Sequence, residues 1–340
     1  MLSEPDRILD FVIAGQLQRD TILPPKGPPS IDILGGGLAY ASAGLAFWGG
    51  QAGMLSKISP DFPMQWLEPM REAGFSLEGI RTSHESIDMR WFVAYSDLQT
   101  AFYDSPITQF ANRGLSVPKE MLNYGRKSSQ DDDLSRYDPK SIGISDIPGN
   151  YLETHAAHIC PINLVSHQVL PNALKRGSVQ TVTMSACPGY MDPTYWEFIP
   201  SLVSDLTAFI VEEADLRRLF QGRSSDLWEM AEAISKYGPE FVLIRMKDGG
   251  QYLFDGVSLK KWTIPMYNGN VMDPTGAADA FAGGFLINYR QTYDPVYATL
   301  CGNVTASFVM EGCGPFYVLG AMPGLKEARL AALKDLVTQM

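Results

Sequence analysis

The residues best suited to do chemistry lie in the segment VMDPTGAADAFAGGFL, at positions 271–286. Pro274 and Gly276 predict a turn, and the alanine- and glycine-rich run after them predicts a helix. The first amides of a helix have no acceptor within it, and together with the helix dipole they bind anions such as phosphate. Small side chains let an anion approach the backbone closely. The segment therefore predicts an anion site from Gly276 to Asp279.

Asp279 is the exception within this segment, because a carboxylate repels an anion bound beside it. Two interpretations are open from the residues alone. Asp279 is either a first-turn acid that stabilises the helix by opposing its dipole, or a general base that takes a proton from a hydroxyl attacking phosphorus. The chain has no G-x-x-x-x-G-K-[ST] and no G-x-G-x-x-G pattern, so the fingerprints of a P-loop and of a dinucleotide-binding fold are missing.

The elements that must position this segment alternate between short apolar strands and longer helices. Strands are predicted at 11–14, 91–95, 158–162, 179–184, 208–211, 241–244 and 251–254, and helices at 38–48, 64–73, 165–175, 225–236, 277–289, 297–310 and 325–337. Such alternation predicts βαβ units around a largely parallel sheet. The segment 123–150 is polar and predicts a solvated loop or insertion.

Composition excludes several classes of protein. With 45% apolar and 19% charged residues, 340 residues bury a large core. The net charge is 27 − 38 = −11 without a basic cluster, which argues against binding nucleic acid or an anionic membrane surface. Residues 33–56 carry no charge, but their glycines leave only 38–48 as a helix, about 16 Å long and half of what a bilayer needs.

The N-terminus, the cysteines and the histidines do not indicate a further function. The N-terminus has acids before a short apolar run, unlike a secretory signal, so we expect a cytoplasmic protein. The four cysteines form no C-x-x-C pair and the four histidines form no metal-ligand pattern, so both groups are expected to be structural.

The segment DPTGAADAFAGGF resembles the C-terminal signature of the PfkB (ribokinase-like) sugar and nucleoside kinases, usually written D-T-x-G-A-G-D-x-F-x-G-G. Residues 35–49 resemble the family's N-terminal G-G-x-x-x-N…L-A-x-L-G signature, and 11–20 its first strand with a substrate-binding aspartate at the end. Residues 241–254 resemble the strand pair before the nucleotide pocket. The order and spacing match from about residue 9 to residue 320.

This resemblance implies a single α/β domain over residues 1–340, a three-layer α/β/α ribokinase-like fold with a mostly parallel central sheet and a small β lid. The lid would come from segments 15–37 and 85–112. The implied activity is transfer of the γ-phosphoryl group of ATP to an alcohol of a sugar, a nucleoside or a related small molecule, with a homodimer formed through the lid. The implied cofactors are ATP, Mg²⁺ and a monovalent cation such as K⁺.

The same resemblance assigns roles to individual residues. Asp279 would be the catalytic base, and the anion hole would be formed by Gly276, Ala277 and Ala278. The residues that bind the substrate would be Asp20, Gly36, Gly37 and Tyr40, and those that hold the metal would be Glu212, Asp215 and Asp273. The loops that bind the nucleotide would include Lys247, Gly250, Thr275, Asn303 and Gly314.

The pattern breaks at several positions around the expected site. Tyr40 replaces a substrate-binding Asn, Ala278 the last glycine of G-A-G-D, Glu212 the Asn of N-x-x-E, Lys247 the first glycine of G-x-x-G, and residues 59–61 the G-D-D turn. Alanine at 278 is harmless if that residue is helical and costs about 1 kcal/mol or more if it needs a positive φ. These breaks leave a second hypothesis open, a catalytically impaired ribokinase-fold protein that binds a nucleotide or another small molecule.

Overall fold

The central sheet has ten strands, and most of them are parallel. The computed structural model describes residues 9–98, 100–125, 138–247 and 249–340. The strands are β1 (Phe11–Ala14), β4 (Ala52–Ile58), β5 (Ser76–Thr82), β8 (Ala156–Ile159), β9 (Thr181–Ser185), β10 (Ala208–Glu212), β11 (Phe241–Arg245), β12 (Gln251–Asp255), β13 (Lys261–Ile264) and β14 (Thr338–Gln339). Their order is β14-β13-β12-β11-β10-β9-β8-β1-β4-β5. The pairs from β5 to β11 are parallel and those from β11 to β14 antiparallel.

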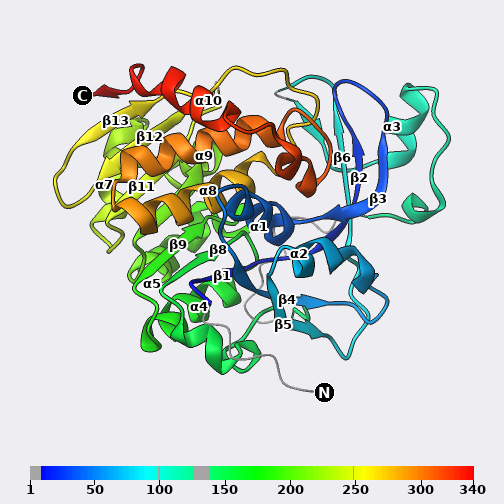
Figure 1. The fold of residues 1–340 in the computed structure, drawn as a ribbon, viewed down its shortest axis with the longest axis horizontal. Helices are drawn as coiled ribbons and strands as arrows, with labels where there is room; N and C mark the ends of the chain where they lie inside the picture. The colour runs from blue at the N-terminus through cyan, green and yellow to red at the C-terminus, as the bar shows by residue number, and fades with distance from the viewer. Residues whose placement is uncertain (1–8, 99, 126–137, 248) are drawn as a thin grey trace.

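Successive strand residues point to opposite faces, and both faces are apolar, so helices cover both. In β1, Phe11 and Ile13 face one core, whereas Val12 and Ala14 face the other. The first face is covered by α1 (Gly37–Phe47), α2 (Glu68–Glu72), α8 (Ala277–Thr292), α9 (Pro295–Val309) and α10 (Leu325–Lys334), and the second by α4 (Leu164–Arg176), α5 (Ile199–Val203), α6 (Glu213–Leu219) and α7 (Leu227–Ser235). The result is three layers, helix on sheet on helix (Figure 1).

A second, smaller sheet lies to one side of the three layers (Figure 1). It contains β2 (Gln18–Leu23), β3 (Ser30–Gly35), β6 (Arg90–Tyr95) and β7 (Ala101–Phe102), in the order β3-β2-β6-β7. Helix α3 (Pro106–Asn112) covers one face through a small core that includes Leu23, Phe92 and Phe110. Alternation along the strands places Asp20 and Trp91, which are partners in the β2–β6 register, on the opposite face.

Close packing of α1 against α8 fixes where α8 begins. A Cβ on Gly44 would lie 2.2 Å from the Ala280 carbonyl oxygen, and one on Gly283 would lie 1.9 Å from that of Ala41. Only glycine permits backbones to approach this closely. The small residues of the 271–286 segment therefore hold the N-terminus of α8 at a defined distance from the start of α1.

The predicted fold class, three layers with a small β lid, is confirmed. The ten-residue helix predicted at 64–73 is wrong in detail, because Met64–Leu67 forms a 3₁₀ turn before α2. The helix predicted to reach 337 ends at Lys334, and the chain then adds β14 to the sheet edge.

The segment 123–150 differs from a wholly solvated loop. Residues 126–137 lie outside the described residues, but Ile142 and Ile147 in the remainder are buried against the sheet core. Within the described ranges, no helix is long and apolar enough to cross a membrane; the uncharged stretch at 38–48 is α1, buried in the body.

Candidate active site

Helix α8 begins after a glycine, Gly276, and any other residue at this position would force its neighbours to move. Gly276 is the N-cap residue with a φ of 76°, and a Cβ there would lie 2.1 Å from the ring of Tyr40. Ala278 is inside the helix and is not among the residues with positive φ, so alanine carries no backbone strain at this position. The open question about Ala278 is therefore answered in favour of an intact helical turn; the Ala277 N–H donates to the Pro274 carbonyl oxygen at 3.3 Å and would have to leave it to bind an anion.

Asp279 lies in the first turn of α8, directly against the start of α1. A Cβ on Gly37 would lie 2.9 Å from Asp279 Oδ1, so the Gly37 backbone forms one wall beside the carboxylate. The carboxylate is deep in the protein yet keeps some surface exposure. Burial raises the pKa of Asp279 to about 6, with Arg245 lowering it and Glu212 raising it. Near neutral pH this group is ionised and still basic enough to accept a proton.

Asp20, on lid strand β2, reaches into the same region. A Cβ on Gly35 would overlap its carboxyl group, at 1.8 Å from Oδ2, so glycine at 35 makes room for Asp20. Asp20 is 1% exposed, and its Oδ1 has no hydrogen-bond partner. Burial, reinforced by the charges of Asp273 and Asp279, raises the pKa of Asp20 to about 8, against the lowering effect of the Gly36 N–H. Such a group is poised to bind a donor such as a hydroxyl.

Tyr40 and Asp273 complete a buried polar group beside Asp20. Tyr40 is 2% exposed; its hydroxyl and Asp273 Oδ2 are both buried without a hydrogen-bond partner. Burial, followed by the nearby charges of Asp20 and Asp273, raises the pKa of Tyr40. Tyr40 thus packs in the core and also borders the predicted site.

A hydrogen-bond chain joins the lid to the turn before α8. The Tyr95 hydroxyl on β6 is 3.1 Å from Thr275 Oγ1, and the Thr275 N–H donates to Asp273 Oδ1 at 2.9 Å. Movement of lid strand β6 would therefore shift the residues immediately before Gly276.

Of the three predicted metal ligands, Glu212 and Asp215 lie near each other, since burial and the charge of Glu212 raise the pKa of Asp215, whereas Asp273 lies beside Asp20. Glu212, at the carboxyl end of β10, pairs with Arg245 at 2.8 Å. Asp215 is buried and bonded to Arg218 at 2.7 Å, while Asp273 lies with Asp20 on the lid side. In the part of the chain that the structure describes, no three His, Cys, Asp or Glu side chains are arranged to hold a metal. Asp215 is thus ion-paired within α6, and its role as a metal ligand stays a prediction.

Glu212 alone suits a magnesium ion bound together with a nucleotide. Its side chain is 48% exposed at the sheet edge near Asp279. Mg²⁺ keeps several waters and needs only one or two carboxylates besides substrate phosphates. The chemistry of this position fits Mg²⁺ delivered with ATP.

Two of the predicted nucleotide residues lie in the turn between β11 and β12. Gly250 has a φ of 83°, and a Cβ there would lie 2.7 Å from the Ile264 carbonyl oxygen, so this turn requires glycine. Lys247 is exposed, and its backbone N–H donates to Glu213 Oε2 at 3.2 Å. Lys247 is therefore a surface residue of this turn, held by its backbone.

Asn303 and Gly314, the other two residues predicted to lie near the nucleotide, come from α9 and from the segment after it. Asn303 is fully buried; its amide nitrogen donates to the Pro265 carbonyl at 2.8 Å and its oxygen accepts from Gln251. Asn303 is thus held inside the core by both ends of its amide, and its place near a nucleotide stays a prediction. Gly314 lies against Ile33 of β3, at the junction with the lid.

Sequence reasoning missed Arg245, which stands next to Asp279 and Glu212. A charged residue directly after the apolar run 241–244 was the available signal, because parallel strands end at the edge where ligands bind. It also missed Gly35 and Tyr95, whose roles depend on lid contacts distant in sequence.

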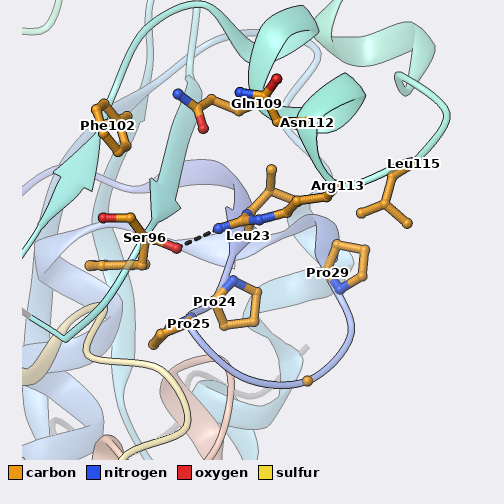
Figure 2. Close-up of a pocket in the computed structure, with 12 residues that line it drawn as sticks. Leu23, Pro24, Pro25, Pro29, Ser96, Phe102, Gln109, Asn112, Arg113 and Leu115 are labelled. Atoms are coloured by element: carbon orange, nitrogen blue, oxygen red, sulfur yellow. Dashed lines mark hydrogen bonds between the residues drawn. The ribbon is translucent and has the colours of Figure 1, made fainter.

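A pocket of about 620 Å³ lies between the lid and α3, with Tyr95 among the residues that line it (Figure 2). Pro24, Pro25, Phe102 and Leu115 give it apolar walls, and Arg113 crosses it to donate to the Tyr95 carbonyl. None of the predicted site residues lines this pocket.

Comparison with known proteins gives consistent results. Residues 155–316 match the model of the pfkB family carbohydrate kinases. A cytidine kinase of Thermococcus kodakarensis is 25% identical over 290 residues, covering 84% of this chain and 90% of that protein. A putative ribokinase II from E. coli, solved with ATP and Mg²⁺, has a TM-score of 0.69 at 13% identity over 95% of this chain and 99% of its own. A nucleoside kinase of Methanocaldococcus jannaschii has a TM-score of 0.64 at 19% identity, with coverage of 95% and 99%.

Proposed function

We propose that this chain, whose residues 155–316 match the model of the pfkB family carbohydrate kinases, is a kinase of that family and transfers the γ-phosphoryl group of ATP to a hydroxyl of a nucleoside or a related sugar compound. In this proposal Asp279 is the general base and the helix start from Gly276 to Ala278 is the anion hole. The observation that carries it is the placement of Asp279 in the first turn of α8, at the carboxyl edge of the sheet and close to Arg245 and Glu212.

The acceptor would lie between the lid and the sheet edge, with Asp20 accepting hydrogen bonds from its hydroxyls. Trp91 is the register partner of Asp20 on the same face of the lid, and its ring is 5.6 Å from that of Tyr103. Aromatic rings beside a hydroxyl-binding carboxylate suit a nucleoside, which has a flat base attached to a polyhydroxylated sugar. The names of the relatives, cytidine kinase and nucleoside kinase, favour the same class.

In the proposed reaction the acceptor oxygen attacks the γ-phosphorus while the bond to the β–γ bridging oxygen breaks, and ADP leaves. Bound Mg·ATP would supply the phosphoryl group, with Glu212 as the residue holding the metal. Asp279 receives the hydroxyl proton, for which its raised pKa of about 6 is suited. The amides after Gly276 stabilise negative charge on the transferred group, and this stabilisation together with alignment provides most of the catalysis.

The proposal includes a monovalent cation such as K⁺ beside Asp273. Asp273 Oδ2 is buried without a partner, and burial raises the pKa of this carboxyl group. A bound cation would neutralise the carboxylate. Turnover in KCl is therefore expected to exceed turnover in tetramethylammonium chloride at the same ionic strength.

One observation favours a second candidate, a nucleotide-binding protein of this fold without kinase activity. The Tyr40 ring packs against the Gly276 backbone, where the family has a smaller substrate-binding Asn. A ring at this position restricts the space open to an acceptor near the helix start.

A panel of nucleosides and sugars, assayed for acceptor-dependent ADP release, separates the two candidates. The kinase proposal predicts turnover with at least one nucleoside and its loss in Asp279→Asn, with the exposed Asp335→Asn as the matched control. Tight Mg·ATP binding without turnover on any acceptor favours the second candidate. Turnover that persists unchanged in Asp279→Asn refutes the proposed base.

A further inference from the structure

Arg245 lies at the centre of the proposed phosphoryl-transfer site, although no part of the predicted machinery includes it. It is the last residue of β11 and the register partner of Glu212, the last residue of β10. Its Nη1 donates to Glu212 Oε1 at 2.8 Å. The arginine side chain is 19% exposed and the glutamate 48%, so the arginine is the inner member of the pair.

The guanidinium also lies beside the first turn of α8. Its central carbon is 5.9 Å from the centre of the Phe281 ring, two residues after Asp279. Arg245 is the principal positive charge acting on Asp279 and lowers the pKa of that carboxyl group. The Arg245 side chain therefore lies among the helix start, the proposed base and the proposed metal ligand.

One nitrogen of this guanidinium, Nε, makes no hydrogen bond within the described structure. Arg245 Nε is buried and has no hydrogen-bond partner. A buried charged donor without an acceptor is costly, so its retention needs a reason. The planar fork of an arginine matches phosphate oxygens, to which it donates two parallel hydrogen bonds.

The charges around Arg245 also indicate that this side chain binds phosphate. Asp279 and Glu212 both carry negative charge where a polyphosphate would arrive, and Glu212 adds a carboxylate to a position where the family resemblance expects an amide. A nearby cation must offset this repulsion. Lys247, which the family resemblance places in a nucleotide loop, is exposed beyond the end of β11, whereas the Arg245 side chain is only 19% exposed.

We propose that Arg245 binds the γ-phosphoryl group of ATP, and that its ion pair with Glu212 holds the guanidinium until a metal reaches Glu212. This inference rests on the proposed function. With Mg·ATP bound, Glu212 would hold the metal, and the released Arg245 guanidinium would donate to the γ-phosphoryl group. The charge of Arg245 thus compensates for Glu212 before ATP binds and for the phosphoryl group afterwards.

The test compares binding of a non-hydrolysable ATP analogue, AMP-PNP, with binding of ADP, using calorimetry with Mg²⁺. A charge-assisted contact to the γ-phosphate predicts that Arg245→Gln weakens AMP-PNP binding by about 10- to 100-fold and leaves ADP binding nearly unchanged. Arg245→Lys, which keeps the charge but not the fork, should fall between. Arg71→Gln is the matched control, because Arg71 also pairs with a glutamate, Glu68, but on an exposed helix.

A second arm tests the coupling to Glu212. Without divalent metal, Glu212→Gln should bind AMP-PNP more tightly than wild type, because the guanidinium is no longer held; an equal or weaker affinity overturns the coupling. Equal losses for AMP-PNP and ADP in both Arg245 variants overturn the γ-phosphate contact while leaving the kinase proposal intact. Failure of the wild-type protein to bind either nucleotide overturns the proposed function and this inference with it.

Discussion

Replacing Asp20 with asparagine should stabilise the ligand-free protein increasingly as the pH rises. Asp20 is 1% exposed, its Oδ1 is unpartnered, and its pKa is raised from 3.8 to about 8. Between those two pH values the folded protein retains a proton that the unfolded chain has released. Stability must therefore fall as the pH rises through this window, at up to about 1.4 kcal/mol per pH unit.

The Asp20→Asn variant lacks this titration, so its advantage over wild type should grow by about 3 kcal/mol from pH 5 to pH 7. An unfolding entropy of about 2.1 cal/mol/K per residue gives about 0.7 kcal/mol/K for 340 residues. Dividing the change of about 3 kcal/mol in unfolding free energy by this entropy gives a Tm difference between the two proteins that grows by about 4 °C from pH 5 to pH 7. Any effect of the asparagine amide on stability that is the same at every pH does not change how the Tm difference depends on pH.

Thermal unfolding of both proteins at several pH values between 5 and 8 measures the slope, with Asp104→Asn, an exposed residue after the same lid sheet, as control. A Tm difference that does not change with pH, or that shrinks as the pH rises, would show that Asp20 is ionised and paired in the folded state. The reasoning that places an uncompensated carboxyl group at the acceptor site would then be refuted.

Three further predictions concern catalysis and binding. Because Asp279 has a raised pKa of about 6 and must be ionised to accept a proton, kcat/KM should fall tenfold per pH unit below about pH 6; a profile flat to pH 5 contradicts this assignment. Gly276→Ala should lower both Tm and kcat/KM, since alanine at a φ of 76° is strained by about 1 kcal/mol or more and its Cβ meets the Tyr40 ring; wild-type values for both contradict the geometry. ATP should bind more weakly in EDTA than in Mg²⁺, because Glu212 and Asp279 otherwise repel the polyphosphate; equal affinities contradict the site.

Local signals predicted much of the fold. The apolar runs that became β1, β10 and β11 are short, β-branched and buried on both faces, which is the pattern that distinguishes inner parallel strands. Strands β2 and β3 were expected only as part of a lid segment, from the family resemblance, because their side chains are mixed and the pairing of β2 depends on the distant β6. The 3₁₀ turn at Met64–Leu67 has the composition of a helix and is set by Pro63 and Pro69 on either side.

The site was predictable where one segment carries the geometry and not where distant segments meet. Gly276 and Asp279 are neighbours in sequence and in space, so the turn-helix pattern located both. The Asp215–Arg218 pair and the buried amide of Asn303 depend on side-chain partners that spacing does not reveal. Homodimerisation through the lid stays a prediction.

The central claim is that Asp279 removes the proton of an acceptor hydroxyl during phosphoryl transfer. The direct measurement is the single-turnover rate of γ-phosphoryl transfer by rapid quench, at saturating Mg·ATP and acceptor, in wild type and Asp279→Asn. The account predicts that the rate of transfer falls by about 10²- to 10⁴-fold while nucleotide affinity is not weakened. An unchanged rate of transfer in Asp279→Asn would contradict it.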